Sequence, residues 1–388
     1  MRNTRPRGET VVIAGALAQR PGVAGHAWVF LQYLLAFRRA GYRVLFVDRL
    51  EPSMCTDTTG VSCPPEHSTQ VAWLNSVFCR AGLHGCWSVR CNDTTLGVPD
   101  SDVRDALRAS ILVLDVMGYL ADDLLIEAAH TAFVDIDPGF GQMWQANGLA
   151  TLFGRHHQYV TVGTNIGAPD CTIPTLGHDW ITTRPPVSLE HWRQTAIPER
   201  CAFSTIATWR GPFAPVEHDG ATYGLRVHEF RAYADLPRRA GLAFNAALAI
   251  DDSDEADRQR LVEGGWRLIA PDGVASDLDR YQTFISESLG EIMIAKNMYV
   301  RSRAGWFSDR SACYLATGRP VLMQDTGFKL TMPIEGGLLQ FATPDEAAEH
   351  ARAIAADPRK HAAAARRIAE DVFAADVVLD ELLRDLEV

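Results

Sequence analysis

Short apolar runs alternate with longer amphipathic stretches along most of this chain. An apolar run bounded by small or polar residues is typical of a buried strand, whereas apolar positions three and four apart indicate a helix. In the first half of the chain the predicted strands are Thr10–Ala18, Tyr42–Asp48, Ser110–Asp115, Thr131–Asp137 and Tyr159–Gly163. The first two flank a predicted helix at Trp28–Ala40, and such strand–helix–strand units build doubly wound parallel sheets.

The alternation is interrupted once, at Thr182–Arg200, which carries three prolines and has no helical periodicity. Proline-rich segments of this kind are typical of a boundary between domains. A second set of apolar runs follows, and its predicted strands are Ala202–Ala207, Ala243–Ile250, Trp266–Ala270, Ile292–Ala295 and Val321–Met323. We therefore predict an α/β protein with two domains, residues 1–185 and 198–370, followed by an amphipathic helix at residues 371–388.

Residues 51–100 are rich in Pro, Thr, Cys and Gly, and only Thr69–Ala81 has a helical pattern there. This window also contains five cysteines and two histidines: Cys55, Cys63, Cys79, Cys86, Cys91, His67 and His84. Zinc sites commonly pair their cysteines as C-x2-C, and no such pair occurs in the window. We therefore predict buried or loop thiols and no metal site, with zinc as the less favoured alternative.

The net charge of −11 at pH 7 argues against nucleic acid or an anionic membrane as the main partner. The apolar fraction of 47% is ordinary for a globular protein, and no apolar run is long enough to span a bilayer. Arg2, Arg5 and Arg7 precede the first strand and could imitate a signal peptide, but Glu9 interrupts this basic region. We therefore predict a cytoplasmic protein with free thiols.

The stretch Gly305–Asp325 predicts a loop, a short helix, a tight turn and a buried strand. Ser308 suits the N-cap position, because its hydroxyl can accept a hydrogen bond from an amide of the first helical turn. Gly318 and Pro320 are placed to end the helix. Free amides at a helix start, together with the positive end of the helix dipole, favour an anionic ligand. The stretch therefore predicts an anion site.

This layout resembles the donor-binding helix of glycosyltransferases with the GT-B fold, in which two Rossmann-like domains face each other. The resemblance implies that the whole chain has this fold and that the last helix crosses back to the N-terminal domain. It also implies two sets of donor-binding residues: Phe307, Ser308, Asp309, Arg310 and Ser311 at the diphosphate, and Gln324, Asp325 and Thr326 at the sugar. Some subfamilies carry a histidine at the position of Gly305, and others carry two glutamates, at the positions of Gly305 and Cys313. This chain has neither pattern, which excludes those subfamilies.

His26 follows the glycines of the loop after the first predicted strand. In many inverting GT-B enzymes, which this chain resembles, a histidine in that loop deprotonates the acceptor hydroxyl. A neutral imidazole at a helix start can accept a proton near pH 7. Such a base usually needs an acidic partner, and Asp115 is our first candidate for that partner and Asp137 the second.

Three basic residues are candidates to neutralise the diphosphate beside the helix amides. Arg226 lies in the loop of the second domain where related enzymes place a cation, Lys296 ends the strand before the donor helix, and Arg310 lies on that helix. Asp309 would repel a phosphate, so we expect it to face a ribose or sugar hydroxyl, or Arg310. The donor site is thus predicted to combine helix amides with two or three cations.

The resemblance implies transfer of a sugar from a nucleotide-diphosphate sugar to a small-molecule acceptor hydroxyl, with inversion and with neither a metal nor another cofactor. The Ala- and Arg-rich composition is typical of a high-GC bacterium, where such enzymes often modify secondary metabolites such as antibiotics. Two alternatives stay open: a UDP-sugar 2-epimerase on the same fold, and a non-catalytic nucleotide- or sugar-binding protein. The nucleotide base, the sugar, the acceptor and the oligomeric state are not specified by the sequence.

Overall fold

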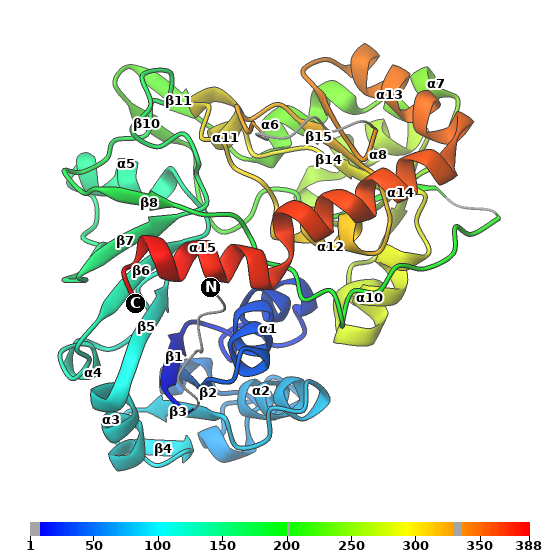
Figure 1. Cartoon of the computed structure of the whole chain (residues 1–388). Helices are drawn as coiled ribbons and strands as arrows, with labels where there is room; N and C mark the ends of the chain where they lie inside the picture. The colour runs from blue at the N-terminus through cyan, green and yellow to red at the C-terminus, as the bar shows by residue number, and fades with distance from the viewer. Residues whose placement is uncertain (1–7, 200–201, 330–335) are drawn as a thin grey trace.

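Two parallel sheets form the framework of the protein in a computed structural model (Figure 1). The structure describes residues 8–199, 202–329 and 336–388. The first sheet has eight strands in the order β4-β3-β2-β1-β5-β6-β7-β8, and its pairs are parallel except for β3 with β4. Its strands are β1 (Thr10–Ala14), β2 (Arg43–Arg49), β3 (Trp87–Cys91), β4 (Thr94–Gly97), β5 (Ser110–Val116), β6 (Thr131–Asp135), β7 (Gln158–Thr161) and β8 (Trp180–Thr182).

The second sheet has six strands in the order β13-β12-β9-β14-β15-β16, all paired in parallel. In both sheets the first strand lies in the middle and the order reverses beside it, which is the doubly wound arrangement. The strands of this half are β9 (Phe203–Thr208), β12 (Phe244–Ala249), β13 (Trp266–Ile269), β14 (Gly290–Met293), β15 (Val321–Gln324) and β16 (Leu338–Phe341), with a separate hairpin of β10 (Val216–His218) and β11 (Ala221–Tyr223).

Helices connect the strands in both halves of the chain. The first half contains α1 (Ala24–Arg39), α2 (Thr69–Arg80), α3 (Asp100–Ala109), α4 (Asp122–Leu125) and α5 (Phe140–Ala146). The second half contains α6 (Arg226–Phe230), α7 (Leu236–Ala240), α8 (Glu255–Glu263), α9 (Asp272–Ala275), α10 (Leu278–Ser286), α11 (Asn297–Ser302), α12 (Asp309–Ala316), α13 (Pro344–Ala356), α14 (Pro358–Ile368) and α15 (Ala375–Asp385). Within the described part of the chain, none of the helices is long and apolar enough to cross a membrane.

The central strand β1 shows why the apolar runs become sheet interior. Its side chains are buried along its whole length, and successive residues point to opposite faces. Val11 and Ile13 pack into the cluster that contains α1, whereas Val12 and Ala14 pack with α3. A parallel sheet covered by helices on both faces needs apolar residues at every position, which explains the continuous runs in the sequence.

The α/β fold class predicted from the alternation is confirmed, whereas several short elements were missed, among them β8, the β10–β11 hairpin, α6 and β16. Residues 51–100, predicted to be irregular apart from one helix, also contain the β3–β4 hairpin. Asn92 makes its turn with a φ of 49°, a conformation that asparagine tolerates. The strands were missed because they are short and because Ser88 and Arg90 interrupt the apolar pattern of β3.

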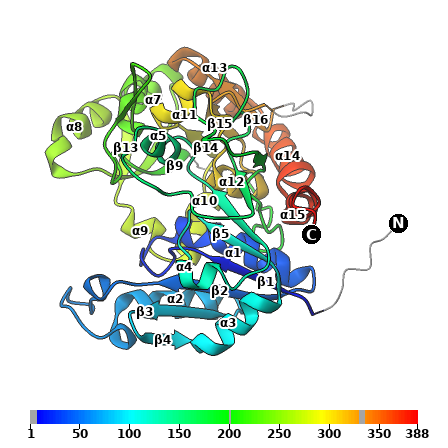
Figure 2. The same ribbon diagram turned by 90° about the vertical axis from the view of Figure 1, so that its left-hand side faces the viewer.

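The end of the chain crosses back to the N-terminal domain, as the resemblance implied. Figure 2 shows α14 and α15 at the right of the view, with α15 ending near the level of α1 of the N-terminal domain. The Val187 amide donates to the Phe373 carbonyl (2.8 Å), and the Ala375 amide donates to the Val187 carbonyl (3.0 Å). On α15, Asp376 forms an ion pair with Arg39 of α1 (3.3 Å). This terminal segment therefore ties the two domains together.

A second connection joins the loop after β7 to the loop before α12. The Thr164 hydroxyl donates to the Gly305 carbonyl (2.9 Å), and the Asn165 side-chain amide donates to the carbonyls of Arg303 and Gly327 (3.0 Å each). At Gly305 φ is 69°, and a Cβ atom there would lie 2.4 Å from the Thr164 hydroxyl. Only glycine allows this close approach, so the N-terminal domain fixes the start of the loop before α12.

Candidate active site

A cavity of about 450 Å³ lies between the two domains. The N-terminal domain contributes the first turns of α1 and the segment after β6, and the C-terminal domain contributes the ends of β9 and β12 and the starts of α6 and α12. Ligands of open α/β sheets bind outside the carboxyl ends of the strands. The cavity faces these ends in both sheets and is therefore the candidate active site.

Helix α12 begins at this cavity, with the boundaries that the sequence predicts. Ser308 is the N-cap residue and lines the cavity, and Gly318, with a φ of 74°, follows the last turn. The Ser308 hydroxyl makes no capping hydrogen bond, however, contrary to its predicted role. The amides of the first turn are therefore not capped by this side chain.

Two guanidinium groups line the cavity with incomplete hydrogen bonding. Arg226, at the start of α6, is buried and donates to the Ile294 carbonyl, and none of the ion pairs of the described residues includes it. Burial, and then the nearby Arg310, lower the pKa of Arg226 to about 10. Arg310 pairs with Glu291 (2.6 Å) and donates to the Ile206 carbonyl, but its Nη2 is buried without a partner among the described residues. Both groups thus retain donors for an anion.

Lys296, the third predicted cation, is already paired across the domain interface. Its ammonium lies 2.5 Å from Oδ2 of Asp137, and the Tyr299 hydroxyl donates to the other oxygen of this carboxylate. Burial, followed by the effect of Asp137, raises the pKa of Tyr299 well above its usual range. All three side chains line the cavity. Asp137, the second candidate partner for His26, therefore balances the charge of Lys296 and joins the two domains at the cavity wall.

His26 lies in the first turn of α1 and lines the cavity. Its Nε2 lies 3.1 Å from the Ala16 carbonyl, which can only accept, so Nε2 carries the proton and Nδ1 has the free lone pair. Burial, and then Arg20, lower the pKa of His26 to about 4. The ring is therefore neutral near pH 7 and can accept a proton at Nδ1.

The predicted pairing of Asp115 with His26 does not occur. Asp115 is buried near the carboxyl end of β5, outside the cavity, and its Oδ1 accepts hydrogen bonds from the backbone amides of Tyr119 (2.8 Å) and Leu120 (3.0 Å). Its Oδ2 lies 3.0 Å from Nε2 of His156. The carboxylate is thus used to shape a loop and to bind a different histidine. A strand end alone did not reveal which of its neighbours the side chain would bind.

Two residues that the resemblance placed at the donor bind inside the protein instead. The Ser311 hydroxyl donates to Glu291 (2.5 Å) from the buried side of α12. The Gln324 amide nitrogen donates to Glu229 (2.5 Å), while its oxygen accepts from the Ala295 amide (3.0 Å). Both ends of Gln324 are therefore occupied, and neither residue lines the cavity.

The predicted sugar-binding residues Asp325 and Thr326 also form a local turn. Asp325 accepts a hydrogen bond from the Gly327 amide (2.8 Å) and lies 3.5 Å from Arg303. The Thr326 hydroxyl donates to the Trp306 carbonyl (2.7 Å) and is fully buried. These bonds hold the loop before α12 in place, and neither side chain lines the cavity.

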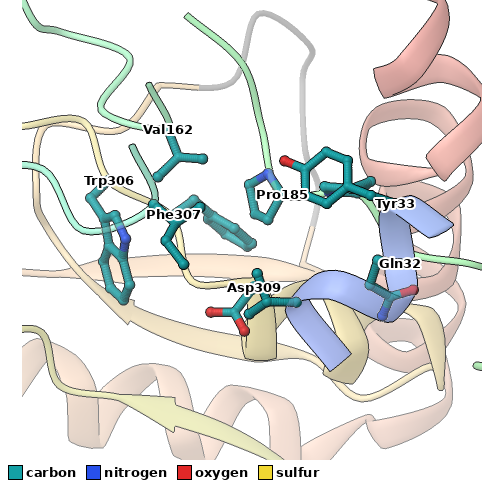
Figure 3. Close-up of a pocket in the computed structure, with 10 residues that line it drawn as sticks. Gln32, Tyr33, Val162, Pro185, Trp306, Phe307 and Asp309 are labelled. Carbon is teal, nitrogen blue, oxygen red and sulfur yellow. The ribbon is translucent and has the colours of Figure 1, made fainter. Parts of the chain in front are cut away.

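Phe307 and Asp309 reach a smaller chamber of about 30 Å³ behind the cavity (Figure 3). Figure 3 shows Tyr33 of α1 and Pro185 of the interdomain segment on other walls of this chamber. Asp309 lines both the chamber and the cavity. Burial raises the pKa of Asp309, while Arg310 and the amides at the helix start act in the opposite direction. Asp309 therefore lies where the two spaces meet.

The sequence interpretation missed the aromatic residues of both spaces. Tyr281, Tyr299 and Trp306 line the cavity, and Tyr33 lines the chamber. For Tyr33 a signal was available: it follows His26 by seven positions, and such residues lie on the same face of a helix. For the other three, no spacing in the sequence connects them to His26, since they come from the opposite domain.

The cysteine window does not form a metal site in the described part of the chain. No group of three or more His, Cys, Asp or Glu side chains in that part is arranged to hold a metal ion. Cys55, Cys63, Cys79, Cys86 and Cys91 are free thiols. Cys55 and Cys91 are buried, and burial, followed by the neighbouring Cys55, raises the pKa of Cys91 to about 11.

Neither a protein-family model nor a curated protein sequence matches this chain. Solved structures match it over nearly its whole length. AviGT4, a glycosyltransferase involved in avilamycin A biosynthesis, is 11% identical, with a TM-score of 0.57 over 98% of this chain and 97% of that chain. An alpha-glucosyltransferase in complex with UDP and a 13-mer DNA is 9% identical, with a TM-score of 0.59 over 98% of this chain and 100% of that chain.

A third match is the pneumococcal O-GlcNAc transferase GtfA in complex with UDP and GlcNAc, which is 9% identical, with a TM-score of 0.53 and 98% coverage of each chain. The chain has the GT-B fold. At these identities the likeness extends to the fold alone. In GT-B terms the cavity is the interdomain cleft, and α12 is the helix of the C-terminal domain that opens into it.

Proposed function

We propose that this protein transfers a sugar from a nucleoside-diphosphate sugar to a hydroxyl group of a second substrate. The observation that carries the proposal is the pair Arg226 and Arg310, which line one interdomain cavity at the start of α12. Among the described residues, Nη2 of Arg310 has no acceptor and Arg226 has a single one, the Ile294 carbonyl. A buried donor without a partner costs about 1–3 kcal/mol, so such groups are retained where a ligand satisfies them. Two guanidinium groups beside a helix start suit a diphosphate.

We propose that His26 is the general base of an inverting, metal-independent reaction. The acceptor oxygen forms a bond to the anomeric carbon, the bond from this carbon to the diphosphate oxygen breaks, and the acceptor proton moves to Nδ1 of His26. The negative charge that develops on the diphosphate is stabilised by Arg226, Arg310 and the amides of α12. Because these groups already supply positive charge, the departure of the diphosphate does not depend on a cation from solution.

We further propose that the second substrate is a small molecule in the cytoplasm. AviGT4 supports this reading, because it takes part in the biosynthesis of a small molecule. The alpha-glucosyltransferase was solved with DNA, but a net charge of −11 disfavours a DNA acceptor for this chain. The proposal thus extends to the modification of a bacterial secondary metabolite.

Nucleotide binding tests the anion site. UDP, GDP and TDP are compared by thermal shift, and a nucleotide at a hundredfold excess over its Kd stabilises the folded protein by about 2.7 kcal/mol. Arg226→Met keeps the volume and removes the charge, and we expect it to weaken binding about tenfold to a hundredfold. Arg239→Ala is the matched control, because Arg239 is exposed and pairs with Asp235 far from the cavity. If nucleotides raised the melting temperature of the Arg226 variant as much as that of the wild type, the anion site would be refuted.

Turnover then separates the candidate functions. We expect His26→Ala to reduce the rate of sugar transfer by about a hundredfold to ten-thousandfold. The rise in melting temperature caused by nucleotide binding should not change. His84→Ala, in an exposed loop, is the control and should keep full transfer. A changed nucleotide sugar without any acceptor would instead identify an epimerase, and binding without either reaction would identify a binding protein. Full transfer by the His26 variant would show that another group removes the proton.

A further inference from the structure

The chamber of about 30 Å³ behind the cavity is a second place where the structure leaves polar groups unpaired. Both domains build it: Tyr33 comes from α1, Pro185 from the interdomain segment, and Phe307 and Asp309 from the loop and helix of the C-terminal domain (Figure 3). Its walls are mainly hydrocarbon. It exists only where the two domains meet.

The chamber adjoins the proposed donor cavity. Four side chains line both spaces: Val29, Ile136, Trp306 and Asp309. Asp309 is also the first residue of α12, the helix at which we place the diphosphate. A sugar attached to that diphosphate therefore lies beside the opening of the chamber, and one of its substituents can enter without leaving the active site.

The polar side chains of the chamber differ in how far they are bonded. Gln32 is occupied, since its oxygen accepts from the Ser188 amide (2.7 Å) and its nitrogen donates to the Cys313 sulfur (3.5 Å). The Tyr33 hydroxyl is fully buried and has no hydrogen-bond partner among the described residues. The Asp309 carboxylate makes no hydrogen bond to another side chain in that part of the protein, and it is close enough to Tyr33 to influence the phenol electrostatically. The unpaired polar group of the chamber is therefore the Tyr33 hydroxyl, because the Asp309 carboxylate also accepts from the amides at the helix start.

The size of the chamber limits what that group can be. A single water needs about 10–15 Å³ when space is measured in this way, so about 30 Å³ accepts roughly two non-hydrogen atoms. A hydroxymethyl group has one carbon and one oxygen. Its carbon would contact the apolar walls at Val29 and Phe307, and its oxygen would reach the two polar groups.

We propose that the chamber binds the exocyclic hydroxymethyl group of the transferred sugar, with Tyr33 and Asp309 as hydrogen-bond partners of its hydroxyl. This inference rests on the proposed function and specifies the donor as a hexose with an intact C6 hydroxyl. A 6-deoxyhexose would place a methyl group in the chamber and leave the Tyr33 hydroxyl unpaired. A site built to bind a hydroxyl discriminates strongly against an analogue that lacks it.

The test compares the binding of two donors by calorimetric titration, which needs no acceptor. UDP-glucose and UDP-6-deoxyglucose are titrated into the wild type and into Tyr33→Phe, with GDP-mannose and GDP-6-deoxymannose as the pair if GDP binds better than UDP. We expect the wild type to bind the hexose at least about tenfold more tightly than the 6-deoxy sugar. In Tyr33→Phe this ratio should fall to within about twofold, while the Kd of the free nucleotide is unchanged.

Tyr223→Phe is the matched control, because the Tyr223 hydroxyl donates to Thr172 (2.9 Å) and lies outside both spaces. It should keep the wild-type ratio. The inference would be overturned if the wild type bound the hexose and the 6-deoxy sugar with Kd values within about twofold of each other, or if Tyr33→Phe left the ratio of these two Kd values unaltered. Either result would indicate that the chamber holds only water. If neither nucleotide binds, the proposed function fails and the inference fails with it.

Discussion

Charged side chains of the two domains are bonded to different extents. In the N-terminal domain Asp48 accepts from the Ala18 and Arg49 amides (2.6 and 2.7 Å), and Asp115 is held by two backbone amides and by His156. In the C-terminal domain Arg226 has a single carbonyl partner among the described residues, and Arg310 keeps one unpaired donor.

This difference shows that a charged residue at a strand end or a helix start has no fixed role. In the N-terminal domain these residues hold the loops in shape, because their acceptors are filled by nearby amides. In the C-terminal domain they retain unused donors at a cavity, which is the arrangement expected of a ligand site. Unused donors at the interdomain cavity, rather than position in the secondary structure, therefore mark the candidate binding residues.

The largest expected effect distinguishes the two arginines of the C-terminal domain. Arg310→Met removes the partner of Glu291, which is fully buried, and we expect a loss of about 3–5 kcal/mol in the free energy of unfolding. Arg226→Met leaves no carboxylate unpaired and should change stability by at most about 1 kcal/mol. Denaturant unfolding measures both values.

The double variant Arg310→Met with Glu291→Gln provides the control. Neutralising Glu291 removes the uncompensated buried charge, so it should restore most of the lost stability. If Arg226→Met proved as destabilising as Arg310→Met, the contrast between a free and a paired guanidinium would be wrong.

The next effect concerns His26 of the N-terminal domain, which lines the cavity. Its pKa is lowered to about 4 in the folded protein from about 6.5 in the unfolded chain, so the unfolded state binds the proton more readily. The resulting stabilisation is complete above pH 6.5 and is lost as the pH falls toward 4, at up to about 1.4 kcal/mol per pH unit. Urea unfolding of the wild type and of His26→Gln at pH 7, 6 and 5 measures it. A stability difference independent of pH would show that His26 titrates alike in both states.

A smaller effect is expected from Asp115→Asn, which keeps the size of the side chain. The asparagine side chain has one oxygen, so it cannot accept both from the two backbone amides and from His156, as the two carboxylate oxygens do. We therefore expect a loss of about 1–3 kcal/mol in the free energy of unfolding. Nucleotide binding should stay within twofold of the wild type, since Asp115 lies outside the cavity. A tenfold loss of nucleotide affinity in a stably folded variant would place Asp115 in the functional site after all.

The smallest effect compares two buried tyrosines. The Tyr314 hydroxyl is bonded to Ser204 (2.6 Å), so Tyr314→Phe should cost about 1 kcal/mol. The Tyr33 hydroxyl has no partner among the described residues, so Tyr33→Phe should be neutral or slightly stabilising in the absence of a donor. The melting temperatures of the two variants check this order. Equal destabilisation would show that the Tyr33 hydroxyl is already bonded, for instance to a buried water.

The sequence determined the backbone framework because its signals are local. Continuous apolar runs specify strands buried on both faces, and Ser308 and Gly318 specify where α12 begins and ends. The same signals placed His26 at the start of a helix on the cavity, whereas Arg226 was chosen from the resemblance and its helix α6 was predicted as a loop. The hairpin of residues 87–97 was missed because its apolar pattern is too short and too interrupted.

Tertiary structure decided which side chains keep free donors and acceptors, because their partners lie far away in the chain. Gln324 is occupied by Glu229, and Lys296 is paired with Asp137 of the other domain. Asp115 binds His156 rather than His26. Hydrogen bonds depend on distances of a few tenths of an ångström, which are set only when the two domains pack. A single sequence specifies which residues follow each strand, but not which partners those residues meet.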